Sequence, residues 1–235
     1  MEKLPDAEPL SHQIPEAFVP KEDGPRFPEL TRENLAELAK NGWERIGVIV
    51  LLLNPAGEVL VAVHGPGNPK VPENMMGVIS ETLKIEADSV EQPVPGISRL
   101  FSEELEMTSE EIQSLNLQTV EHGAWQNVTF PLRGGRDALG MVIVLEADEK
   151  SVQILSGRGA NLTPRSEIKF ISFMDKNPLA HGAPVTENFR PATARIFQAA
   201  MELLTTPQNK SRLELPPPKK PTQKATEDLK DLLHE

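Results

Sequence analysis

Runs of apolar residues separated by turn residues predict strands and helices along most of the chain. The segments rich in β-branched and other apolar residues, which favour strands, are 45–53, 58–63, 75–79, 115–120, 124–132, 141–145 and 168–174. Apolar residues recur at helical spacing in 32–40, 95–107 and 191–204. The turn residues Asn54–Gly57 connect the first two strands. This alternation predicts the α/β fold class.

The predicted helix at 95–107 carries more carboxylates than packing requires. Its apolar stripe consists of Ile97, Leu100, Phe101 and Leu105. Glu104 falls inside this stripe, where an unpaired charge is costly, so we expect a metal ion or an arginine beside it. Glu103 flanks Glu104, and Arg99 lies one turn earlier. An ordinary surface ion pair between Arg99 and Glu103 is the simpler alternative.

The composition changes this picture at both ends of the chain. The 235 residues suffice for one domain with tails. Residues 1–29 are rich in proline and acidic residues, which predicts a disordered arm. We expect the globular domain at 30–205, followed at 206–235 by a Pro/Lys-rich linker and a short helix. That final helix is either a frayed end or a docking peptide for a protein partner.

The charge and residue content exclude several classes of function. A net charge of −11 argues against binding of bulk nucleic acid, which needs a basic surface. The absence of cysteine excludes disulfides, thiolate nucleophiles and cysteine zinc sites. The longest apolar run, 46–53, is too short to span a membrane, and the N-terminus lacks signal-peptide features. We therefore expect a soluble, cytoplasmic protein.

One segment follows the second half of a known motif. Glu91, seven further residues and then Arg99-Leu100-Phe101-Ser102-Glu103-Glu104-Leu105-Glu106-Met107 resemble the box of the Nudix hydrolases. That box reads Gly, five residues, Glu, seven residues, Arg-Glu-apolar-x-Glu-Glu-x-Gly-apolar. The resemblance covers about residues 43–204, and it implies an α-β-α sandwich with a mixed β-sheet.

Three positions depart from the family pattern. Thirteen residues separate Gly77 from Glu91, so either the loop is enlarged or Glu81 takes the role of the family glutamate. Leu100 stands where the family has the glutamate after the arginine, and Glu106 stands where it has glycine. The box is therefore degenerate.

The resemblance implies a metal-dependent hydrolase that cleaves a pyrophosphate bond in a nucleoside diphosphate derivative. Glu103 and Glu104 would hold Mg²⁺ or Mn²⁺, and Arg99 would orient them. The glutamates Glu81, Glu91 and Glu146 are candidates for further metal oxygens. The alternative, favoured by the degenerate box, is an inactive module that binds a ligand or a protein.

Further candidates have simpler alternatives. Arg158 and Arg165, in an expected loop at 157–165, could clamp a phosphate, or they are solvated loop charges. Glu146 is either a ligand or the first solvated position after a strand. His64 could face a pocket, and Trp125 either stacks on a base or belongs to the core. The sequence leaves a homodimer open.

Overall fold

A computed structural model describes most of the chain. The described residues are 13–19, 27–66, 73–86, 89–119, 125–132, 136–163, 167–174, 189, 192–205, 211–219 and 228–233. In chain order the elements are η1 (Glu16–Phe18), α1 (Arg32–Lys40), β1 (Trp43–Leu53), β2 (Val59–His64), β3 (Met76–Gly77), β4 (Ile79–Thr82), β5 (Ile85–Glu86), β6 (Ser89–Val90), α2 (Pro93–Glu104), α3 (Ser109–Ser114), β7 (Leu117–Thr119), β8 (Trp125–Leu132), β9 (Arg136–Ala147), α4 (Glu149–Gly159), β10 (Ile168–Met174), α6 (Thr193–Thr205), β11 (Ser211–Leu213) and η3 (Leu229–Leu233).

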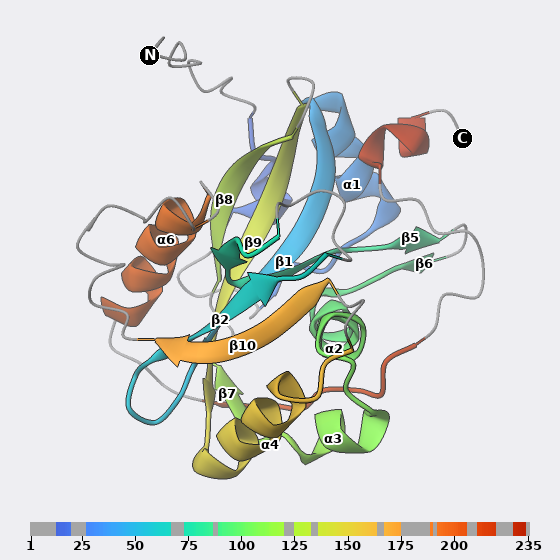
Figure 1. Cartoon of the computed structure of the whole chain (residues 1–235). Coiled ribbons are helices and arrows are strands. Elements are labelled where there is room, and N and C mark those ends of the chain that lie inside the picture. The colour runs from blue at the N-terminus through green and yellow to red at the C-terminus, as the bar shows by residue number, and fades with distance from the viewer. Residues whose placement is uncertain are drawn as a thin grey trace, which may run out of the picture.

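A nine-stranded mixed sheet forms the centre of the structure (Figure 1). Its strands follow the order β10-β2-β1-β9-β7-β11, while β3 pairs with β2, β4 with β1 and β8 with β9. The ladder between β1 and β9 is parallel and runs to the pair Leu53 and Glu146. The other ladders of this sheet are antiparallel. A separate hairpin of β5 and β6 precedes α2.

The two faces of the sheet are covered by different helices. Side chains of β1 alternate between the faces. Val48, Val50 and Leu52 join the core cluster that includes residues of α1, α2, α3, α4 and η3. Ile49, Leu51 and Leu53 join the cluster formed with α6. The result is an α-β-α sandwich, which confirms the predicted fold class (Figure 1).

Local sequence signals predicted several elements well. Thr31 caps α1, because its hydroxyl accepts a hydrogen bond from Asn34 N at 3.3 Å. Gly57 has a φ of 77°, which suits the turn between β1 and β2.

Two segments differ from the elements expected from the sequence. The loop expected at 157–165 begins inside α4, and the connection expected at 80–94 contains most of β4 and the β5–β6 hairpin.

The described parts of both tails pack on the domain rather than extending from it. Phe18, in the arm expected at 1–29, is fully buried. Within the segment expected to be a linker, β11 pairs with β7. Leu229 of η3 is also fully buried in the core of its own chain. Both tails also contain residues that lie outside the described part. No helix among the described residues is both long enough and apolar enough to cross a membrane.

Candidate functional site

Helix α2 is held against the sheet by its apolar stripe. Ile97, Leu100 and Phe101 are fully buried in the core. Gly96 allows the close approach, since a Cβ at this position would lie 2.3 Å from Cδ2 of Leu83. Leu83 directly follows β4 in the chain, so this packing brings α2 next to the end of that strand.

The guanidinium of Arg99 gathers three carboxylates around this contact. The Arg99 side chain is only 2% exposed. Nε and Nη2 donate to the two oxygens of Glu91 at 2.9 and 2.8 Å, which is a bidentate pair. Nη1 donates to Glu103 Oε2 at 2.9 Å and lies 3.1 Å from Glu81 Oε2. Nη2 also donates to the carbonyl oxygen of Thr82 at 2.6 Å.

Each carboxylate oxygen of Glu81, Glu91 and Glu103 already accepts a hydrogen bond or contacts a cation. Glu81 Oε1 accepts from Thr82 N at 2.9 Å, and Glu91 Oε2 accepts from Lys84 N at the same distance. Glu103 Oε1 lies 3.1 Å from Lys84 Nζ. We call Glu81, Glu91, Arg99 and Glu103 the Arg99 cluster.

The electrostatics of the cluster follow from its burial. Burial alone would lower the pKa of Arg99, but hydrogen bonding to Glu91 and the negative charges of Glu81, Glu91 and Glu103 raise it above its usual range. Burial raises the pKa of Glu81, the attraction of Arg99 opposes this rise, and the charge of Glu103 adds to it. Arg99 therefore stays protonated, whereas burial makes the ionised form of Glu81 costly.

Leu100 and Glu104, which directly follow Arg99 and Glu103 in α2, differ sharply in their exposure. Leu100 is fully buried, so the position where the family has a glutamate belongs to the core. Glu104 is the last residue of α2 and is partly exposed. Among the described residues, no three His, Cys, Asp or Glu side chains are grouped so that they could hold a metal ion.

Glu106 occupies the position of the family glycine and adopts the backbone conformation that favours glycine. Its φ is 52°, in the left-handed region. The next residue, Met107, donates its backbone N–H to the carbonyl oxygen of Phe101 at 3.2 Å. The Glu106 carboxylate accepts two hydrogen bonds from Thr163, from N at 3.2 Å and from Oγ1 at 2.7 Å. These bonds offset part of the backbone strain.

We expect the Glu106→Gly variant to be more stable than the Glu106→Ala variant by about 1 kcal/mol, measured by denaturant unfolding. Both variants lose the hydrogen bonds to Thr163, so the difference between their free energies of unfolding isolates the effect of the left-handed backbone conformation. The control is Ser156, an exposed helical position of α4. Here Ser156→Gly should be less stable than Ser156→Ala, because glycine is less favourable than alanine in a helix. Equal stabilities at position 106 would contradict the backbone argument.

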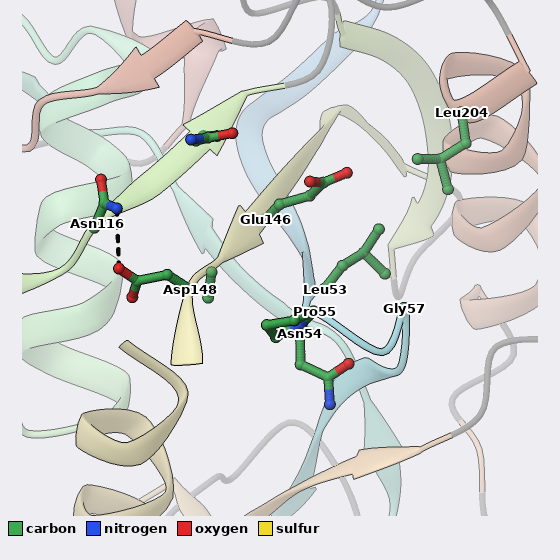
Figure 2. Close-up of a pocket in the computed structure, with 10 residues that line it drawn as sticks. Leu53, Asn54, Pro55, Gly57, Asn116, Glu146, Asp148 and Leu204 are labelled. Carbon is green, nitrogen blue, oxygen red and sulfur yellow. Dashed lines mark hydrogen bonds between the residues drawn. The ribbon is translucent and has the colours of Figure 1, made fainter. Parts of the chain in front are cut away.

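Glu146 lies on the opposite face of the sheet from the Arg99 cluster. In β9 it follows Val142 and Val144 in alternation, and both of these pack with α6. Its neighbours line a pocket of about 350 Å³ at the ends of β1 and β9 (Figure 2). The lining residues are Leu53, Asn54, Pro55, Gly57, Asn116, Gln118, Glu146, Ala147, Asp148 and Leu204. The structure thus does not bring Glu146 to α2.

The two candidate phosphate-binding arginines lie apart from the cluster or outside the described residues. Arg158 belongs to the last turn of α4 and not to a loop, and its Nη2 lies 2.6 Å from Glu111 Oε2. A hydrogen bond from the Thr108 backbone lowers the pKa of Glu111, and Arg158 lowers it further. Arg165 is not among the described residues.

Sequence reasoning missed Lys84 as a member of this region. The sequence did contain a signal for it, since Lys84 stands between two apolar residues, Leu83 and Ile85, that are buried.

Trp125 is 4% exposed and belongs to the core, as the simpler alternative for it predicted. His64 is 5% exposed at the end of β2.

Comparisons with known proteins found similarity in solved structures. No protein-family model matches the chain, and no curated protein matches it. A NUDIX hydrolase from Nitrosomonas europaea is 10% identical, with a TM-score of 0.41 and coverage of 67% of this chain and 88% of that chain. A hydrolase of the NUDIX family from Clostridium perfringens is 14% identical, with a TM-score of 0.41 and coverage of 68% and 97%. A mutT/nudix family protein from Listeria innocua is 10% identical, with a TM-score of 0.41 and coverage of 68% and 94%.

Proposed function

We propose that the chain is a Nudix-like hydrolase that cleaves a pyrophosphate bond in a nucleoside diphosphate derivative with the help of Mg²⁺ or Mn²⁺. The observation that carries this proposal is the buried Arg99, whose guanidinium contacts Glu81, Glu91 and Glu103 where α2 packs beside the end of β4. Such a concentration of carboxylates around one arginine is more than an amphipathic helix needs for packing.

In this proposal a hard divalent cation would take its protein ligands from Glu103 and Glu104, and the substrate would have to supply the rest of the coordination. Glu103 is 44% exposed on its side chain, and its Oε1 already attracts the ammonium of Lys84 at 3.1 Å. Glu104 follows it directly in α2. Magnesium is commonly bound by one or two carboxylates together with substrate phosphate and water. Two glutamates are therefore enough only when a diphosphate is present.

The remaining residues of the cluster have a positioning role in this proposal. Both oxygens of Glu91 are engaged by Arg99, so Glu91 orients the guanidinium rather than holding the cation. Arg99 in turn fixes the rotamer of Glu103 through Nη1. When bound, the cation would polarise the diphosphate and stabilise the charge that develops as water attacks phosphorus.

The test is a hydrolysis screen over nucleotide sugars, dinucleotides and nucleoside triphosphates, with and without Mg²⁺ or Mn²⁺. Wild type should show metal-dependent release of nucleoside monophosphate together with a sugar phosphate, a second nucleotide or pyrophosphate, and Glu104→Gln should reduce kcat/KM at least tenfold. Glu110→Gln, which alters an exposed glutamate of α3, is the matched control and should retain activity. Turnover that survives Glu104→Gln would refute the assigned role of Glu104.

A second candidate is a domain without catalysis that binds a ligand or a protein. The specific observation in its favour is the complete burial of Leu100, which removes a family carboxylate from the site. This candidate predicts equal ligand affinity with and without Mg²⁺ and no turnover of any substrate in the screen. A sharp rise of both affinity and turnover with metal would decide for the hydrolase.

A further inference from the structure

Helix α2 is buried on every side at its middle. All residues from Gly96 to Phe101 are buried, and this segment is longer than one helical turn of 3.6 residues. A helix that only faces a core buries one stripe and leaves the opposite face in water. Ile97, Leu100 and Phe101 form such a stripe on α2. The other sides of α2 must therefore be covered by further parts of the chain.

The described part of the C-terminal tail, residues 211–219, contacts the Ser98 side of α2 (Figure 1). Ser98 is fully buried, and its hydroxyl donates a hydrogen bond to the carbonyl oxygen of Pro216. Arg99, the next residue, is turned away from Ser98 by about 100° around the helix axis. The tail and the Arg99 cluster therefore hold α2 from two different sides.

This tail reaches α2 from the edge of the sheet. Its first residues form β11, which pairs with β7 through three residue pairs from Ser211 to Leu213. Thr119 of β7 supports this ladder, since its Oγ1 donates to the carbonyl oxygen of Ser211 at 3.2 Å. Leu213 is 9% exposed, and Leu215 packs against the same core as α2. We call residues 211–219 the strap.

The strap is easier to open than the domain that it holds. Its ladder has three residue pairs, and β11 stands at the end of the strand order. Segments with few buried contacts open locally at a free energy below that of global unfolding. The prolines at 216–218 have no N–H group and so donate no hydrogen bond to the domain. Their fixed φ restricts the free strap to extended conformations, which lowers the entropy lost when the strap closes again.

We propose that the strap is a releasable clamp that holds α2 in place and keeps the Arg99 cluster assembled. When the strap is seated, α2 is fixed between Pro216 on one side and the carboxylates of Glu81 and Glu91 on another. When the strap opens, the Ser98 side of α2 meets water, and the helix gains freedom to move away from these carboxylates. The guanidinium of Arg99 then loses part of its burial. This coupling between tail and cluster requires neither a metal nor turnover, so it goes beyond the proposed function.

The first measurement uses a thiol as a probe of strap opening, because the chain contains no cysteine. Ser98→Cys places a single thiol beside the strap, and its rate of reaction with dithiobis(nitrobenzoate) reports its exposure. Ala62→Cys, at a position 1% exposed in β2, reports opening of the core. In the full chain the Ser98→Cys thiol should react about tenfold or more faster than the Ala62→Cys thiol. Equal rates would mean that the strap opens only with the whole domain, which would overturn the proposal.

The second measurement releases the strap with Leu213→Asp, which places a charge at a position that is 9% exposed. This substitution should raise the reaction rate of the Ser98→Cys thiol about tenfold or more and leave that of the Ala62→Cys thiol unchanged. Leu233→Asp, at an exposed position of η3, controls for a new charge in the tail and should change neither rate. The proposal is overturned if the Ser98→Cys rate does not rise, or if the Ala62→Cys rate rises equally because the whole domain has loosened.

The third measurement follows the cluster itself. Phenylglyoxal modifies accessible guanidinium groups, and peptide mass spectrometry gives the rate of modification for each arginine. Arg99 is 2% exposed, so it should react slowly in wild type and about threefold or more faster in Leu213→Asp. Arg158, which pairs with Glu111, is the control and should react equally in both proteins. An opened strap with an unchanged rate at Arg99 would overturn the coupling between strap and cluster.

Discussion

Replacing Arg99 with methionine is expected to lower the free energy of unfolding by about 3–5 kcal/mol at neutral pH. Methionine can fill part of the space but donates no hydrogen bond. Glu81 and Glu91, each 15% exposed on its side chain, would lose their counter-ion, and the carbonyl group of Thr82 would lose a donor. Urea unfolding at fixed ionic strength measures the change, and an unchanged m-value would indicate that the denatured state is unaffected.

The matched control for this prediction is Arg158→Met. Arg158 also makes an ion pair with a glutamate, but the two side chains are 21% and 32% exposed. Water can replace the lost partner there, so a loss of about 1 kcal/mol or less is expected. The double variant Arg99→Met with Glu91→Gln should recover part of the lost stability, because one unpaired carboxylate is removed with its partner. A loss for Arg99→Met no larger than that for Arg158→Met would contradict the proposed role of burial.

The second large effect is expected for Leu100→Glu, which introduces a carboxylate at the position where the Nudix box has glutamate. Leu100 is fully buried, so this substitution exchanges an apolar core contact for a carboxyl group without a prepared partner. We expect the free energy of unfolding to fall by about 2–4 kcal/mol at neutral pH. Burial would raise the pKa of the introduced carboxyl group. The penalty should therefore shrink as the pH falls and the group becomes neutral, as measured by unfolding between neutral and acidic pH.

Leu100→Met controls for the loss of leucine at this position. It conserves volume and should cost less than about 1.5 kcal/mol, with no dependence on pH. If Leu100→Glu is instead as stable as Leu100→Met and gains affinity for Mn²⁺, then the site can accept a third carboxylate. That outcome would mean that packing does not exclude a family-type metal site from α2.

The fold was predictable where burial leaves a strong periodic signal. The apolar run of β1 and the capped helix α1 were found because their patterns are local. Helix α4 was missed since its buried residues are Ser151, Leu155 and Gly159, which give a weak apolar stripe. The β5–β6 hairpin has strands of two residues each, too short for any alternation to be recognised.

The candidate site was predictable where its members are close in sequence. The pair of Arg99 and Glu103 was expected from their helical spacing. Glu81 and Glu91 were candidates only for metal oxygens, and the structure places both beside the guanidinium. The position of Glu146 was not predictable, because strand alternation says only that neighbours face opposite sides. Which side carries α2 depends on contacts between distant segments.

The central parallel ladder has a consequence for how the chain reaches this structure. Leu53 pairs with Glu146, 93 residues further along the chain, so closing the loop between them costs much conformational entropy before any pairing can compensate. The partners of Arg99 lie only 4 to 18 residues away, from Glu103 to Glu81. We therefore expect the ion cluster to assemble early around α2, and the later meeting of β1 and β9 to limit the rate of folding.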